Sequence, residues 1–218
     1  MCISEKVSWT TLVIGSIINI LIIIYLVRIP DPKVIIPIIL ILAWQYALLM
    51  QIPDALAWRY PTAQYPGKLA FILNATQPLV LFILVVIGLT KMGISLERLV
   101  PAIIALTIYS VLTIKDTINR QDYNIQPPKQ CKYLSYSWWT GSKYVFYVLS
   151  IVLTILCFVP AWGYIGLSLV IFTASIVASK IVAGKNCSPG SLWCWSIAGS
   201  GLCTFIYYLL FKLYKSNY

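Results

Sequence analysis

Long apolar runs separated by short polar stretches recur along the whole chain. Seven of them are close to 20 residues, the length that a helix needs to cross about 30 Å of hydrocarbon. Because lipid offers the backbone no hydrogen-bond partner, runs of this length are predicted to be helices. The expected fold is all-α, a seven-transmembrane-helix bundle in a polytopic membrane protein. The predicted spans are residues 8–27, 34–52, 69–89, 95–114, 144–160, 162–183 and 193–214.

The pattern predicts one membrane domain over residues 1–218, with a polar loop at 115–143 and no soluble domain. The first run could instead be a cleaved signal peptide. It is longer than a usual signal core and has no small-residue cleavage site, so we expect it to be retained as a helix. Local kinks are expected at prolines near or inside the helices, namely Pro37, Pro53, Pro78 and Pro101.

Composition supports a membrane protein. The chain is 60% hydrophobic and 10% charged, and its mean hydropathy is +0.86, whereas a soluble domain carries about 25% charged residues. The lipid bilayer is therefore the expected partner. The net charge of +10 needs no nucleic acid to explain it, because basic loops are usual in membrane proteins.

Seven spans place the N-terminus and the loops near 59–68, 115–143 and 184–192 on one side of the membrane, here named face A. Face B holds the other loops and the C-terminus. Face A carries ten Lys and Arg residues and face B six, so the positive-inside rule predicts that face A and the N-terminus are cytoplasmic.

Tryptophan is distributed unevenly between the two faces. A lipid-anchoring belt alone would populate both interfaces, so the bias predicts an aromatic vestibule at face A, with an uneven belt as the alternative. Six of the eight tryptophans map there. The proposed vestibule residues are Trp138, Trp139, Trp193 and Trp195.

The segment "LLMQIPDALAWRYPT" ends the second span with a carboxylate, Asp54. Gln51, Asp54 and Trp58 are spaced to share one helical stripe. One interpretation is an acid at headgroup depth near Arg59. The other is a proton- or cation-binding carboxylate, since ionisable groups in membrane helices are expensive and usually functional.

Deeper in the spans lie four amide side chains: Asn19, Gln45, Asn74 and Gln77. Asn74 and Gln77 could continue a polar path from Asp54. Amides also hold helices together through hydrogen bonds, and packing is the favoured interpretation for this set. In the last span, packing is favoured as well for a stripe of mostly small residues, Ser196, Gly199, Ser200, Cys203 and Tyr207.

Four of the six cysteines map to face A, namely Cys2, Cys131, Cys187 and Cys194. If face A is exoplasmic, Cys2 and Cys194 could form a disulfide; a reducing cytoplasm disfavours one. With no His and no C-x-x-C motif, no metal site is predicted. The last span also lacks an internal lysine that could hold retinal. No cofactor and no enzymatic activity are expected.

Several short motifs resemble one family of small multi-span membrane proteins from large DNA viruses, protists and bacteria. They are the initial Met-Cys, "QIPDALAW", "NATQPLVLF", "SWW" and "SLWCW". No established activity is associated with that family, so the resemblance implies architecture and candidate positions, and a virus-encoded protein in a host or virion membrane. The matched positions are Cys2, Gln51, Asp54, Trp58, Gln77, Pro78, Trp193, Cys194 and Trp195. The chain departs from the pattern at Asp54, where Glu is more usual, and in lacking a loop His of the viral members.

These observations predict a channel or transporter for a small cation, with the proton as one candidate. The candidate ion or substrate site consists of Asp54, Gln51, Trp58, Arg59, Asn74 and Gln77. The alternative is a non-transporting scaffold or receptor-like protein that binds a partner or lipid through the face-A aromatics and cysteines. That alternative predicts that the four amides are all paired. The sequence leaves the oligomeric state open, a homo-oligomer included.

Overall fold

The computed structural model of the chain describes residues 4–120, 123, 125–126, 135–136, 142–158, 163, 166, 170, 174 and 190–216. These residues are almost entirely helical, as the apolar pattern predicts. The α-helices are α1 (Glu5–Leu26), α2 (Ile35–Leu48), α3 (Gln51–Arg59), α4 (Tyr65–Lys91), α5 (Val100–Asn119), α6 (Ser142–Cys157) and α8 (Gly190–Ser216). Two short 3-10 helices, η1 (Pro32–Val34) and η2 (Leu96–Leu99), precede α2 and α5.

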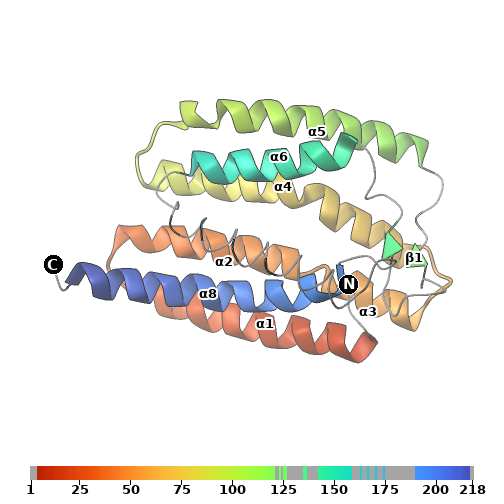
Figure 1. Ribbon diagram of the computed structural model, residues 1–218, viewed down its shortest axis with the longest axis horizontal. Helices are drawn as coiled ribbons and strands as arrows, with labels where there is room; N and C mark the ends of the chain where they lie inside the picture. The colour runs from red at the N-terminus through yellow and green to blue at the C-terminus, as the bar shows by residue number, and fades with distance from the viewer. Residues whose placement is uncertain are drawn as a thin grey trace.

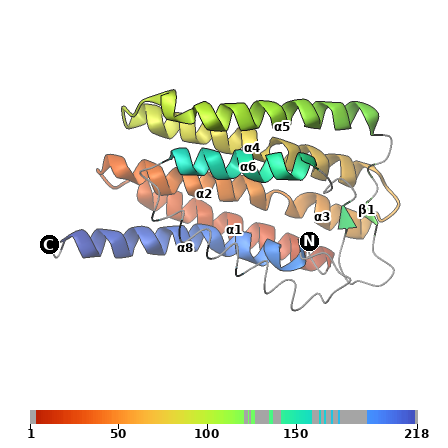
Figure 2. The same cartoon turned by 45° about the horizontal axis from the view of Figure 1, so that its top comes forward.

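The helices form an elongated bundle with their axes roughly aligned (Figure 1). α4, α5 and α6 lie on one side, and α1, α2 and α8 lie on the other. α2 contacts α4 across the middle, and α3 packs against α1 and α4. Both views place the starts of α1, α4, α6 and α8, together with α3 and the end of α5, at the same end of the bundle (Figures 1 and 2). This end corresponds to face A.

Within the described residues, four helical segments are long and apolar enough to cross a membrane: Glu5–Leu26, Pro32–Arg59, Tyr65–Lys91 and Leu96–Asn119. The segment Val145–Cys157 is a shorter apolar helix. These segments confirm the all-α, membrane-type fold. Most of the predicted span 162–183 lies outside the described residues, although Gly163, Gly166, Val170 and Ala174 are helical.

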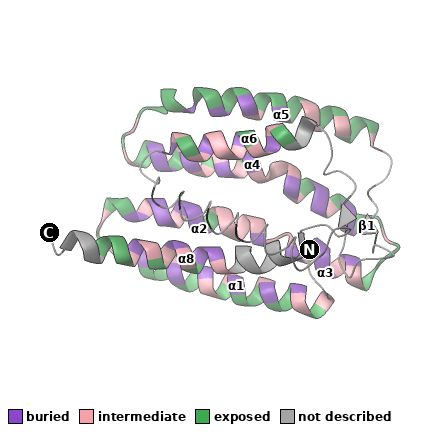
Figure 3. Ribbon diagram, viewed as in Figure 1, coloured by how far each residue is buried: buried purple, intermediate pink, exposed green. Residues whose placement is uncertain are grey.

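Large aliphatic side chains cover the outer surfaces of the helices. On α1, the side chains of Val13, Ile14, Ile17, Ile20, Leu21 and Ile24 are exposed, and α5 shows a similar outer surface (Figure 3). A soluble protein rarely exposes apolar patches of this size. In a bilayer this surface faces lipid tails, which are as apolar as the side chains themselves.

The boundaries of the predicted loop 115–143 were wrong at its start. α5 continues to Asn119, beyond the apolar run, because Asp116 forms an ion pair with Arg120 one turn later at 2.9 Å. The loop also contains a short antiparallel strand pair, β1 (Ile125–Gln126) and β2 (Ser135–Tyr136).

The second predicted span is divided rather than continuous. A proline has no N–H, so Pro53 cannot complete the α-helical bond to the carbonyl of Leu49. The N–H of Ile52 donates to that carbonyl instead at 3.0 Å, and the N–H of Met50 donates to Ala47 at 3.2 Å. These tighter turns separate α2 from α3. The kink expected at Pro53 is therefore present, and Asp54 falls in the first turn of a new helix.

Candidate functional site

Asp54 and Gln51 are buried inside the bundle near face A. The exposed fraction is 2% for Asp54 and 1% for Gln51. α1 and α4 both pack against α3, the short helix that carries Asp54. Asp54 is therefore covered by protein, and its depth relative to the lipid headgroups stays a prediction. Gln51, Asp54 and Trp58 each make a polar or ring contact in the structure, so none of them is a free group.

Trp58 and Arg59, the other candidate residues of α3, have different surroundings. Trp58 packs against a small apolar cluster formed by Ala57, Ala70 and Phe71. Arg59 has 61% of its side chain exposed, and its guanidinium lies 3.8 Å from the carboxylate of Glu5 at the start of α1. Arg59 thus forms its described ion pair with a surface acid at face A.

A hydrogen-bonded chain links α1 and α2 at the middle of the bundle. The side-chain amide of Asn19 donates to Gln45 Oε1 at 2.9 Å, and Gln45 Nε2 donates to the hydroxyl of Ser16 at 2.8 Å. Bonds of this kind hold membrane helices together and contribute about 0.6–2 kcal/mol each. The prediction that these amides serve packing is confirmed for Asn19 and Gln45.

Three tyrosines from three helices converge on consecutive residues of α4. Tyr46 of α2 shares a 2.5 Å hydrogen bond with Thr76, and Tyr109 of α5 donates to the carbonyl of Ala75 at 3.2 Å. Tyr147 of α6 donates to Gln77 Oε1. The contacts lie directly before Pro78, which lacks the N–H that would hold the helix together there.

The same contacts bear on the predicted polar path. Asn74 is buried in α4, but the side-chain oxygen of Gln77 is engaged by Tyr147 in the direction of α6. The sequence pattern did not predict these tyrosine contacts. A tyrosine within an apolar span was the available signal, because a buried phenol usually finds a hydrogen-bond partner.

The predicted small-residue stripe of the last helix is buried only in part. Among the α8 residues whose burial is described, Ser200, Gly201, Thr204 and Tyr208 are buried, whereas Gly199, Cys203 and Tyr207 are half-buried. Gly199 has no atom within 4 Å of the position that a Cβ would take, whereas a Cβ on Gly201 would lie 1.9 Å from Asn19 Oδ1. Gly201 is therefore the residue that allows α8 to approach α1.

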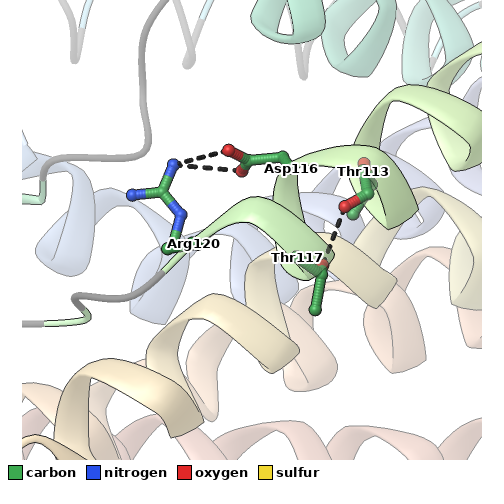
Figure 4. A network of polar contacts seen from close by, with 4 residues as sticks. All are labelled: Thr113, Asp116, Thr117 and Arg120. Atoms are coloured by element: carbon green, nitrogen blue, oxygen red, sulfur yellow. Dashed lines mark hydrogen bonds and ion pairs between the residues drawn. The ribbon is translucent and has the colours of Figure 1, made fainter.

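The last turns of α5, at face A, contain a network of polar contacts among Thr113, Asp116, Thr117 and Arg120 (Figure 4). Arg120 donates to both oxygens of Asp116 at 2.9 and 3.0 Å, and the Thr117 hydroxyl donates to the carbonyl of Thr113. The guanidinium carbon of Arg120 also lies 5.8 Å from the ring centre of Phe71 in α4. This arrangement fastens the end of α5 to the start of α4.

Several predicted site residues lie outside the described part of the chain. Cys2, Cys131, Cys187, Trp138 and Trp139 are among them. Trp193, Cys194 and Trp195 belong to the first turns of α8, but their side chains are not described. The vestibule and the Cys2–Cys194 pair therefore stay predictions, although the start of α8 does lie at the same end of the bundle as α3 (Figures 1 and 2).

The described residues hold no group of three or more His, Cys, Asp or Glu side chains that is placed to bind a metal ion. They do provide the buried carboxylate of Asp54 and the buried amide of Gln51 one turn away. Hydrogen bonds between helices lie deeper in the bundle, such as the one from Asn19 to Gln45. A carboxylate in these surroundings can bind a proton or a cation. Known protein families, curated proteins and solved structures were each searched, and none matches this chain.

Proposed function

We propose that this protein is a seven-helix membrane protein that binds a proton or another small cation at Asp54 and transports it. The burial of Asp54 at 2% exposure inside a helix bundle carries this proposal. Gln51, one turn away and equally buried, shapes the site, and Trp58, one turn further along α3, packs against the neighbouring apolar cluster.

The physical reason lies in the energy of a buried acid. An aspartate costs about 2.5–3.5 kcal/mol at the centre of a membrane helix on insertion scales, and acids within membrane spans usually bind ions or relay protons. Asp54 lies nearer the face-A end, so its cost is smaller than that of a central acid. A packing role alone would be served by Asn, which has nearly the same shape and no charge. The presence of an ionisable group at a buried position therefore favours a function that uses its charge.

Flux in proteoliposomes tests the proposal. Purified wild-type protein, Asp54→Asn and Asp54→Glu are reconstituted at equal density, and cation- or pH-driven flux is followed with an internal dye. Asp54→Asn is expected to abolish the flux, and Asp54→Glu, which keeps the charge, is expected to retain part of it. Glu5→Gln is the matched control, because it removes an acid at the same end that is partly exposed. Equal flux in wild type and Asp54→Asn would leave Asp54 with a structural role only.

A second candidate function is a non-transporting scaffold or receptor-like protein that binds a partner or lipid at face A. It is favoured by the pairing of three of the four deeper amides: Asn19 with Gln45, and Gln77 with Tyr147. This candidate predicts no flux in wild type. It also predicts that ligand or partner binding is unaffected by Asp54→Asn.

The sidedness of the protein belongs to the same proposal: face A is cytoplasmic. Reaction of Cys2 and Cys194 with a membrane-impermeant thiol reagent tests this. Labelling is expected only when the cytoplasmic side is open to the reagent, and without prior reduction. Labelling from the outside would show that face A is exoplasmic. Labelling only after reduction would show that the cysteines form a disulfide. The viral origin implied by the family resemblance stays a prediction.

A further inference from the structure

The interior of the bundle changes from polar to apolar along its length. The buried residues of α1, taken in order from face A, are Ser8, Thr11, Gly15, Asn19, Ile22 and Leu26. The half of this helix that lies nearer Asp54 thus turns small and polar groups inward. The half nearer face B turns large aliphatic groups inward.

The other helices follow this gradient in part. From face A inward, α4 buries mostly small residues and one amide, and then mostly aliphatic residues: Pro66, Gly67, Ala70, Phe71, Asn74 and Pro78, followed by Leu81, Val85, Gly88 and Leu89. α6 buries Tyr147, Ser150 and Thr154 before Phe158, which follows the helix, and α8 buries Ser200, Gly201 and Thr204 before Tyr208. α2 enters from face B with Ile36, Ile39, Leu40 and Ile41, and leads to Gln51 and Asp54 in α3.

The face-B half forms one continuous apolar cluster. It joins residues of α1, α2, α4 and α8 together with the residues that flank α5 and α6, among them Leu26, Ile39, Val85, Leu99 and Phe158, each of which is almost completely buried. Apart from the hydroxyl of Tyr208, the buried side chains of this cluster offer no hydrogen-bond partner to water or to an ion. Moving an unpaired charge through it would cost several kcal/mol or more.

The face-A half of α1 holds two buried polar atoms with unused bonding capacity. Thr11 Oγ1 and Asn19 Oδ1 have no hydrogen-bond partner in the described part of the chain, whereas Tyr208 is the one residue of the face-B cluster whose side chain has such an atom there. Thr11 and Asn19 belong to the inward stripe of α1, the helix that packs against α3. They can exchange hydrogen bonds with water or with a proton carrier.

We infer that Asp54 exchanges its proton or cation with face A alone, and that the apolar half of the bundle is the barrier toward face B. This inference rests on the proposed function, since it takes Asp54 as the binding group. It makes the protein a one-sided binding site in this conformation rather than an open channel. Transport then requires the apolar half to open.

The charged side chains described at this end come from four helices. α1 contributes Glu5 and Lys6, α3 contributes Arg59, α4 contributes Lys68, and the end of α5 contributes Lys115, Asp116 and the following Arg120. Glu5 is held by Arg59 at 3.8 Å, and Asp116 is held by Arg120 at 2.9 Å. An acid-specific signal that disappears in Asp54→Asn but persists in Glu5→Gln and in Asp116→Asn therefore reports on Asp54.

A one-sided pH jump provides the test. The full chain is reconstituted in liposomes, and a tag at the C-terminus, which follows the face-B end of α8 (Figure 1), is used to separate the two orientations. The carboxyl band of Asp54 is followed as the infrared difference between wild type and Asp54→Asn. Vesicles with face A outward are expected to show the band immediately. Vesicles with face B outward are expected to show it only after a protonophore has equilibrated the lumen.

An immediate response from face B, or no response from either face, would overturn the inference. These outcomes are separable from a failure of the proposed function. If wild type transports nothing but the band still responds from face A alone, the transport proposal fails and the one-sided site stands. If flux depends on Asp54 but the band responds equally from both faces, the transport proposal stands and the one-sided site fails.

The role of the apolar half as a barrier is tested by replacing a buried valine with threonine, which has nearly the same shape but carries a hydroxyl. Val85→Thr places a hydroxyl in the buried apolar half, and Ile87→Thr places one on the lipid-facing side of the same helix. Val85→Thr is expected to admit protons from face B severalfold faster than wild type, whereas Ile87→Thr is expected to leave the rate unchanged. Equal rates in the two variants would overturn the assignment of the barrier.

Discussion

Asn19 Oδ1 lies against the backbone of α8 at Gly201, so closely that a Cβ at Gly201 would come within 1.9 Å of it. The same amide donates to Gln45 of α2 from its other side. One residue thus fixes the spacing of three helices at the middle of the bundle. Because helices in lipid gain nothing from hydrophobic association, close contact and hydrogen bonding hold them together.

The first prediction concerns this contact. Gly201→Ala is expected to destabilise the bundle by about 1–3 kcal/mol, the usual cost of overpacking, because the new methyl group displaces the Asn19 side chain. Gly199→Ala is the control, since nothing lies within 4 Å of its added Cβ. Thermal loss of helical circular dichroism in detergent measures both. A lower midpoint in Gly199→Ala than in Gly201→Ala would show that α8 packs through the stripe that the sequence suggested.

The second prediction concerns the tyrosine that bonds Gln77. Tyr147→Phe removes the hydroxyl and leaves Gln77 Oε1 without that donor, so a loss of about 1 kcal/mol is expected. Adding Gln77→Met removes the stranded acceptor and should recover part of the loss. Tyr25→Phe, on the lipid-exposed side of α1, serves as the control. Strictly additive effects in the double variant would contradict the coupling.

The third prediction contrasts two arginines at face A. Arg120 is 16% exposed in its side chain, binds both oxygens of Asp116 and lies over the ring of Phe71, whereas Arg59 reaches Glu5 from an exposed position at 3.8 Å. Exposed pairs contribute little and are screened by salt. Arg120→Gln should therefore lower the unfolding midpoint more than Arg59→Gln. The difference is expected both at low salt and at about 0.5 M NaCl, where the Debye length lies between about 3 and 10 Å. Equal losses would show that the contacts of Arg120 add nothing.

The fourth prediction concerns the end of α4. Gly93 has a φ of 66°, and the bonds from Ile94 N–H to Leu89 and from Gly93 N–H to Thr90 form a Schellman cap. Since a left-handed residue is strained when it carries a Cβ, Gly93→Ala should cost about 1 kcal/mol. Gly166→Ala, at a helical position with open space around it, should cost nothing. The thermal unfolding midpoints of the two variants, measured in the same detergent, test this expectation. A Gly93→Ala variant as stable as wild type would rule out the cap as a source of stability.

The pattern of apolar residues determined that the chain forms long apolar helices, because lipid leaves the backbone no other way to satisfy its hydrogen bonds. It predicted seven spans, and the described residues contain four helices long and apolar enough to cross a membrane. The sequence also indicated the break at Pro53, since a missing N–H is a property of a single residue, and it singled out Asp54 as an ionisable group whose role stays a prediction. These features are local, and a linear sequence displays them directly.

Which side chains meet was decided only by tertiary structure. Nothing in the spacing of Tyr46, Tyr109 and Tyr147 indicates that they reach consecutive residues of α4, and the choice of Gly201 over Gly199 depends on the rotation of α8 about its axis. When a helix is apolar on nearly every side, its sequence sets no strong preference for which side faces inward. The rotation is then fixed by a few polar contacts and close approaches between helices, and those exist only once the bundle has assembled.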